Sequence, residues 1–194
     1  MSWNIPGTVL KIEKQEAERI EDVFRGMFLG GGIVLSQVSG VTGLEPYTVQ
    51  NWVKREFLPP PEHKRYNMNQ LCRIITINML KKVLPMEQIC GLLTYINGEL
   101  DDASDDLIDD SKLYFLFVNL AANFATMHNP AGRDAAIDQA LKGYREPIPG
   151  AKNRVEKVLR VMLTAWAAAQ LRAQAEKMVL ELKNAPAESG TNQS

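Results

Sequence analysis

Apolar residues recur every three to four positions along most of the chain, which is the spacing of one face of an α-helix. This pattern predicts longer helices over residues 8–28, 67–83, 86–96, 113–127, 133–144 and 152–183. The glycine run at residues 30–32 ends the first of them, because glycine disfavours helix continuation. We therefore expect a mainly α protein whose last helix spans on the order of 45 Å.

Two shorter helices are predicted before the helix that begins at residue 67. Ser36 is suited to cap a helix over residues 37–42, and Gly43 stands where a tight turn requires positive φ. Pro46 suits the first turn of a second helix over residues 46–55, because that position does not use a backbone N–H. The pattern predicts a helix-turn-helix.

One side of the second short helix is polar. Tyr47, Gln50, Asn51 and Lys54 follow the i, i+3, i+4, i+7 spacing of a single helical face. Amide side chains can pair with adenine edges, and lysine can pair with guanine or phosphate. The stripe predicts contact with the major groove of duplex DNA, and an ordinary solvated helix face is the alternative.

A run of three prolines follows this helix and forces extended backbone. The chain then presents His63, Lys64, Arg65 and Tyr66 on a short loop. Two cations beside an imidazole and a phenol predict a wing over residues 62–66 that lies along the phosphate backbone. A polar surface loop is the alternative interpretation.

These segments together resemble the MerR family. The family's recognition-helix segment is similar to Val41-Thr42-Gly43-Leu44-Glu45-Pro46-Tyr47-Thr48-Val49-Gln50-Asn51-Trp52. The segment that follows that helix in the family is similar to Phe57-Leu58-Pro59-Pro60, and the family's wing is similar to Lys64-Arg65-Tyr66. The chain is similar in particular to an uncharacterised bacterial family described as a domain of unknown function with a MerR-like helix-turn-helix. The resemblance covers about residues 33–97 and implies a MerR-like winged helix-turn-helix that binds double-stranded DNA.

The resemblance also bears on individual positions. Thr48 matches the family's threonine, whereas Gln50, Glu56 and Lys64 replace a basic residue, a glycine and an arginine. These changes weaken the contacts that the resemblance implies with phosphate. The predicted DNA-binding residues are Tyr47, Thr48, Gln50, Asn51, Lys54, Arg55, His63, Lys64, Arg65 and Tyr66.

The domain organisation follows from these elements. We expect an N-terminal helix and glycine linker over 1–32, the winged unit over 33–97, an acidic linker over 98–110, a C-terminal helical bundle over 111–183 that pairs two copies, and a disordered tail over 184–194. The acidic linker holds seven acids and no base, but it lacks the ordered ligands and glycine of an EF-hand. It is expected to be solvated and to supply acids to the N-terminus of the next helix.

Charge and cysteine usage narrow the function classes. The net charge is −1, but residues 33–97 hold seven Lys and Arg against four Asp and Glu, which suits a polyanionic partner. Cys72 and Cys90 lack CxxC spacing and are expected to be buried thiols in a reduced compartment. They could bind metal with His63 and His128 only by tertiary coincidence, so we expect no metal and no cofactor.

The functional expectation is a cytoplasmic, non-enzymatic, DNA-binding transcriptional regulator that forms a homodimer. No catalytic set, export signal or long apolar segment stands out in the sequence. One alternative is a helical protein-interaction module that derives from a winged helix-turn-helix and has lost DNA binding. Another is an excisionase-like factor that bends DNA. The sequence assigns no effector ligand.

Overall fold

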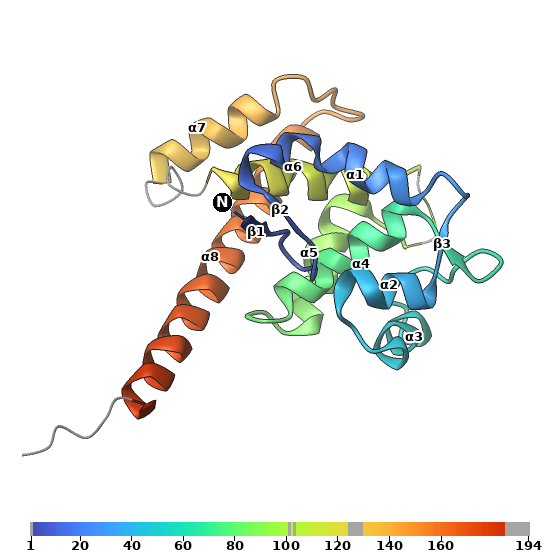
Figure 1. Ribbon diagram of the computed structural model, residues 1–194. Coiled ribbons are helices and arrows are strands. Elements are labelled where there is room, and N and C mark those ends of the chain that lie inside the picture. Colours follow the sequence, from blue (N-terminus) through green and yellow to red (C-terminus); the bar gives the residue numbers. More distant parts are fainter. Residues whose placement is uncertain (1, 101, 103, 124–129, 185–194) are drawn as a thin grey trace, which may run out of the picture.

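The protein is mainly helical, as expected, and is described by a computed structural model over residues 2–100, 102, 104–123 and 130–184 (Figure 1). The elements in chain order are β1 (Ser2–Asn4), β2 (Lys11–Glu13), the 3₁₀ helix η1 (Lys14–Arg19), α1 (Ile20–Met27), β3 (Ile33–Val34), α2 (Leu35–Thr42), α3 (Pro46–Lys54), β4 (Arg65–Tyr66), α4 (Met68–Leu80), α5 (Met86–Asn97), α6 (Asp110–Ala122), α7 (Pro130–Ala140) and α8 (Ala151–Asn184). None of the helices within these ranges combines the length and apolarity needed to cross a bilayer.

Helix α4 lies at the centre of the molecule and packs against α2, α5, α6 and α8. Ten of its thirteen residues are buried, because its sequence is apolar on nearly every side. The predicted capping box at its start is confirmed. The Gln70 N–H donates to Asn67 Oδ1 and the Asn67 N–H donates to Gln70 Oε1, both at 2.9 Å.

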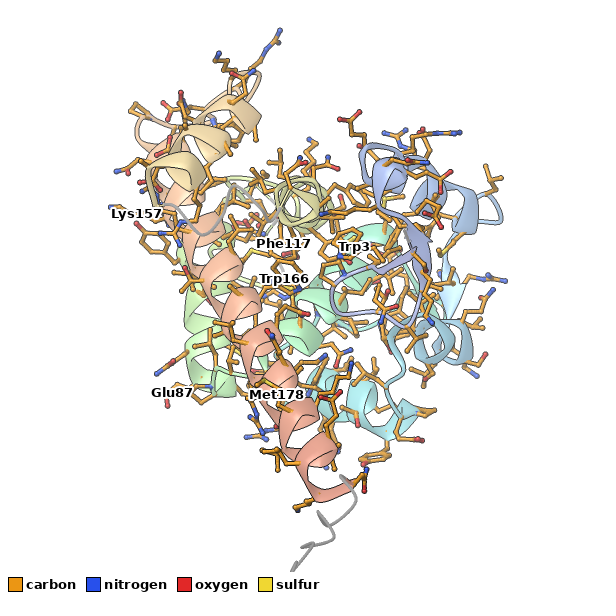
Figure 2. All side chains as sticks on the ribbon, turned by 60° about the vertical axis from the view of Figure 1, so that its left-hand side comes forward. Trp3, Glu87, Phe117, Lys157, Trp166 and Met178 are labelled. Atoms are coloured by element: carbon orange, nitrogen blue, oxygen red, sulfur yellow. The ribbon has the colours of Figure 1, made fainter. Side chains whose placement is uncertain are left out.

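Aromatic side chains of α6 join the N-terminal segment and α8 to this centre. The Tyr114 ring is buried, and its hydroxyl donates to the carbonyl of Pro6 at 2.7 Å. The rings of Phe117 and Trp166 meet edge to face at 6.3 Å, and Figure 2 shows the two side chains together in the interior. The buried apolar side chains from Ile5 to Trp166 therefore form one continuous core.

The N-terminal region differs from the expected helix over residues 8–28. Its first part is a β-hairpin in which Trp3 of β1 lies opposite Ile12 of β2. Residues 11–13 alternate between exposed and half-buried, and this period of two is that of a strand. Gly7 makes the turn at a φ of +78°, and a Cβ there would lie 2.6 Å from the Ile75 carbonyl oxygen. The helical pattern applies only from η1 onwards.

Helix boundaries differ elsewhere by a few residues. Helix α2 begins at Leu35 rather than 37, so Ser36 lies inside it and Val34 holds the N-cap position. The Val34 N–H donates to Gln37 Oε1 at 2.9 Å. Helix α7 ends four residues earlier than expected, and α6 begins three residues earlier. The predicted stretch over 124–127, His128 and the tail from 185 lie outside the described residues.

The acidic segment is only partly solvated. Leu107 and Ile108 are each 5% exposed and belong to the core. Asp109 precedes the first turn of α6 and Asp110 lies in it, so the expected placement of acids at a helix N-terminus is confirmed. Leu107 and Ile108 therefore anchor the second half of the acidic segment in the core.

Candidate functional site

Helices α2 and α3 meet at a tight turn that fixes their relative position. Gly43 follows α2 with a φ of +69°, and its N–H donates to the Ser39 carbonyl at 2.8 Å. The Thr42 hydroxyl donates to the Val38 carbonyl at 2.8 Å and accepts from the Leu44 N–H at 3.2 Å. These bonds satisfy the end of α2, and the expected role of Gly43 is confirmed.

Helix α3 has a buried side and an exposed side. Val49 is fully buried, Trp52 is 7% exposed, and Lys81 Nζ lies 5.3 Å from the Trp52 ring centre. Every member of the predicted stripe is exposed, and Thr48 beside it is half-buried. The Tyr47 side chain is 64% exposed. The core thus holds α3 with its polar face outward.

The predicted wing is a short hairpin with a strained tip. The Arg65 N–H donates to the Glu62 carbonyl at 2.8 Å, which closes a two-residue turn. His63 and Lys64 form this turn at φ values of 48° and 64°. Two positive φ values characterise a type I′ turn, and a non-glycine residue there costs about 1–3 kcal/mol. The fold therefore holds both side chains in a defined exposed position.

Tyr66 does not lie on the surface of this hairpin, contrary to expectation. Strand β4 pairs with β3, with Ile33 opposite Tyr66 and Val34 opposite Arg65. Successive side chains of a strand point to opposite sides, so Arg65 is exposed and Tyr66 is only 3% exposed. Burial raises the pKa of Tyr66. The Arg65 guanidinium donates to the Gly32 carbonyl at 2.9 Å, which steadies the hairpin.

A hollow of about 680 Å³ separates α3 from the hairpin. Its apolar lining residues are Val34, Leu35, Val53, Pro61 and Tyr66, and its polar lining residues, called its rim, are Ser36, Gln50, Lys54 and Lys64. The rim brings together Gln50, Lys54 and Lys64, which are three of the predicted DNA-binding residues. Tyr66, a fourth predicted residue, lines the hollow from its buried position. The remaining six, Tyr47, Thr48, Asn51, Arg55, His63 and Arg65, do not line it.

The surface charge is smaller than the sequence suggested. Over residues 45–66, two lysines and two arginines face three glutamates, and all seven are exposed. Arg73, one of the seven cations counted in residues 33–97, is 8% exposed and pairs with Asp110. Its charge is therefore neutralised within the protein, and the local cationic excess is modest.

Arg73 belongs to a buried polar network that the sequence reading missed. Its Nη1 lies 3.3 Å from Asp110 Oδ2, and its Nε donates to the Phe57 carbonyl at 3.2 Å. Asn97 Nδ2 also donates to Asp110 Oδ1 at 3.3 Å. The network ties the segment after α3 to α5 and α6. A single arginine inside an apolar run was the only sequence signal for it.

Burial changes the acidity of the carboxyl groups around this network. It raises the pKa of Asp110, although the Arg73 charge acts in the opposite direction. Burial, followed by repulsion from Asp110 and Asp105, raises the pKa of Asp106 to about 6. The Asp106 carboxyl therefore changes its protonation near pH 6.

The cysteines differ in burial. Cys72 is fully buried and burial raises its pKa well above its ordinary value, whereas Cys90 is half-buried. Both thiols are unbonded. Among the described residues, no three His, Cys, Asp or Glu side chains come together as a metal site.

Comparison with known proteins finds similarity to families without an assigned function. A model described as "Domain of unknown function (DUF1836)" matches residues 33–117. The protein "Uncharacterized protein YkrK" of Bacillus subtilis (strain 168) is 28% identical over 86 residues, which are 42% of this chain and 37% of that relative. The chain thus aligns with little more than a third of the relative's length. No solved structure matches the chain significantly.

These findings overturn the expected relationship to the MerR family. Neither match indicates a MerR or helix-turn-helix family. The turn glycine, the helix-starting proline and the apolar spacing that carried part of the resemblance are common to helices joined by a tight turn. The proline exit at residues 57–60 and the hairpin residues 64–66 carried the rest, and they do not by themselves identify a family. The matched unit also extends twenty residues beyond 97, into α6, whose aromatic residues pack in the core. What the comparisons show is a similarity of residues 33–117 to a domain of unknown function.

Proposed function

We propose that the chain is a DNA-binding regulator that acts as a homodimer, with α2, α3 and the hairpin at residues 62–66 serving as a winged helix-turn-helix. The observation that carries this proposal is the face of α3, where Tyr47, Gln50, Asn51 and Lys54 are all exposed above a buried Trp52. An α-helix with such a face fits the major groove of B-DNA.

Base recognition is assigned to the amides of α3. Gln50 and Asn51 are adjacent residues on the exposed side of α3, and each can make a bidentate contact with adenine. Lys54 lies one turn from Gln50 and can address guanine or phosphate. Tyr47 and half-buried Thr48, at the start of the helix, are assigned contacts with the DNA phosphate backbone.

Phosphate contact is assigned to the hairpin tip and the end of α3. His63, Lys64 and Arg65 are exposed, and Lys64 shares the rim of the hollow with Gln50 and Lys54. Arg55 is also exposed, and its guanidinium lies 4.9 Å from the Phe57 ring centre. Tyr66 has no contact role in this proposal, because it is buried.

Binding to random duplexes at two salt concentrations tests the proposal. Asn51→Ala should weaken binding by about 1–3 kcal/mol for preferred sequences and relax base preference. Lys64→Ala should weaken binding to all sequences similarly and reduce the slope of log affinity against log salt by about 1. Asn153→Ala and Lys157→Ala are matched controls, because both residues are exposed on α8 and Figure 2 labels Lys157 near its upper end. Neither control should change binding.

Two outcomes contradict the proposal. One is the absence of any DNA binding at low salt, where phosphate contacts are strongest. The other is binding that the two control variants weaken as much as Asn51→Ala and Lys64→Ala do. Sequences selected from random duplexes give the preferred site, and a palindrome in them supports the action of two copies.

A second candidate function is the binding of a protein through the same face. The hollow beside α3 has a mostly apolar lining, and the positive and negative charges over residues 45–66 nearly cancel. Both features suit a protein segment better than a bare polyanion. A variant that fills the hollow, Val53→Trp, separates the candidates. It should abolish binding of a protein that uses the hollow and leave DNA contacts by Asn51 intact.

A further inference from the structure

We propose that the far half of α8 pairs in antiparallel orientation with the same segment of a second copy of this chain. The pairing surface, called the α8 seam below, consists of Ala168, Leu171, Ala175, Met178 and Leu182. The inference deepens the homodimer in the proposed function, but it is argued without reference to DNA.

Helix α8 carries two apolar faces. One face is buried in the core through Val155, Val158, Leu159, Met162 and Trp166. Leu171 is nine residues from Met162, which at about 100° per residue is a half-turn of the helix. The α8 seam therefore lies on the side opposite the core. An ordinary surface helix has polar residues on that side.

The far half of α8 extends away from the body of the protein. Figure 1 shows the helix projecting past the other elements, and every residue from 170 to 184 is exposed. Figure 2 shows Met178 on this projecting part, whereas Trp166 is turned into the interior. Leu171, Met178 and Leu182 are 60%, 57% and 77% exposed. Such large apolar side chains in a row indicate an interaction surface.

The spacing of the α8 seam is that of a coiled coil. Its members are separated alternately by three and four residues, which is the a/d pattern of a heptad repeat. Thr164 continues the same pattern toward the first half of α8, where it is still exposed but α7 contacts the helix. Arg133 Nη1 donates to Thr164 Oγ1 at 3.2 Å, and Arg160 Nε lies 2.8 Å from Asp134 Oδ1. The α8 seam is thus the uncovered continuation of an existing helix–helix contact.

The charged residues of this segment lie off the α8 seam and pair within the helix. Arg172 Nε lies 2.8 Å from Glu176 Oε1, and Lys177 Nζ lies 3.6 Å from Glu181 Oε1. At about 100° per residue, Glu176 and Lys177 lie more than 100° away from the centre of the seam. The seam itself therefore carries no charge, which suits an apolar face such as its own in a second copy.

The sizes of the apolar residues favour the antiparallel orientation. The antiparallel register centred between residues 176 and 177 places Ala175 level with the second copy's Met178, so that a small residue meets a large one, and it pairs Leu171 with Leu182. A parallel pair instead places alanine opposite alanine in two layers, which leaves them underfilled. The two exposed seams bury on the order of 1,000 Å², at the low end for specific interfaces. Association in the micromolar range is therefore expected.

Sedimentation velocity of the full chain without DNA tests the pairing. At roughly 1 to 100 µM the mass should rise from 21.7 kDa to twice that value. Leu171→Glu combined with Met178→Glu should keep the chain monomeric throughout, with an unchanged helical circular dichroism spectrum. Leu29→Glu is the matched control, because Leu29 is 90% exposed but lies far from α8 in sequence, and it should leave the dimer intact. A monomeric wild type, or a double variant that still dimerises, overturns the proposal.

Cysteine crosslinking tests the orientation. In a chain with Cys90→Ser, the variants Leu171→Cys and Leu182→Cys are prepared separately with different tags and exposed to air. An antiparallel pair gives a disulfide only when the two variants are mixed, whereas a parallel pair crosslinks each variant with itself and overturns the proposed orientation. Because neither experiment contains DNA, their failure is distinguishable from failure of DNA binding.

Discussion

Two exposed helical surfaces of this protein differ in what lies beneath them. The polar face of α3 stands over Trp52 and Val49 in the core, and a strained turn, a capping box and a buried ion pair surround it. The α8 seam lies on the far half of α8, where every residue from 170 to 184 is exposed and no packed layer lies beneath the helix.

The difference shows how each surface is prepared for a partner. The α3 face depends on many long-range contacts that hold a few polar groups in register, as a recognition surface requires. The α8 seam depends only on helix formation and on an unburied apolar row. Substitutions beneath α3 should therefore change stability strongly, and substitutions on the seam should not.

Arg73→Ala is expected to have the largest effect. It leaves Asp110 buried without its cationic partner and removes the bond to the Phe57 carbonyl. Loss of one partner of a buried pair costs about 3–5 kcal/mol of unfolding free energy. Urea denaturation measures the loss of unfolding free energy in Arg73→Ala. Arg172→Ala is the matched control on α8, because its pair with Glu176 is exposed and should contribute at most about 0.5 kcal/mol. Equal effects of the two variants would show that the network does not support the fold.

Gly43→Ala should have the next largest effect. The φ of +69° disfavours any side chain, and the added Cβ would lie 2.8 Å from Val9 Cγ1. We expect a loss of about 1–3 kcal/mol, measured by thermal unfolding. Gly40→Ala is the control within α2, because no atom lies within 4 Å of its Cβ position, and it should stabilise by up to about 1 kcal/mol. A neutral Gly43→Ala would mean that the α2–α3 turn can relax.

Local signals predicted this turn and its surroundings well. Gly43, Pro46 and the Asn67–Gln70 capping box each act within four residues, and all three took their expected roles. Helix α8 was also predicted almost to its ends, because a long periodic pattern is a strong signal. The exposed side of α3 followed from the same periodicity.

Features that depend on contacts distant in sequence were missed. The pair Arg73–Asp110 spans 37 residues, and Tyr66 is buried because β4 pairs with β3 more than thirty residues earlier. Strand β2 was read as the start of a helix because Ile12 also fits the helical period of the apolar residues that follow it. These outcomes were decided by tertiary packing, which overrides local pattern.

Asp106→Asn should have a smaller effect that depends on pH. The folded state holds the Asp106 pKa at about 6, above its ordinary value, so the folded protein binds an extra proton between about pH 4 and 6. The stability that this proton provides is present below about pH 4 and is lost as pH rises through 6. The variant should therefore be more stable than wild type at pH 7 by about 1 kcal/mol or less, and equally stable near pH 4.

Urea midpoints at several pH values measure the Asp106 effect. Asp102→Asn is the control, because hydrogen bonds from Ser104 lower the pKa of that exposed carboxyl. It should give no gain at pH 7. A pH-independent difference between wild type and Asp106→Asn would contradict the raised pKa.

The smallest effect is expected from the α8 seam itself. Leu171→Glu with Met178→Glu replaces exposed side chains by another good helix former, so the monomer at low concentration should change by within about 0.5 kcal/mol. Leu159→Ala on the buried face of the same helix should instead cost about 2–5 kcal/mol. Thermal unfolding of both at submicromolar concentration makes the comparison. If the seam variant lost as much as Leu159→Ala, the far half of α8 would pack within its own chain, and the contrast with α3 would fail.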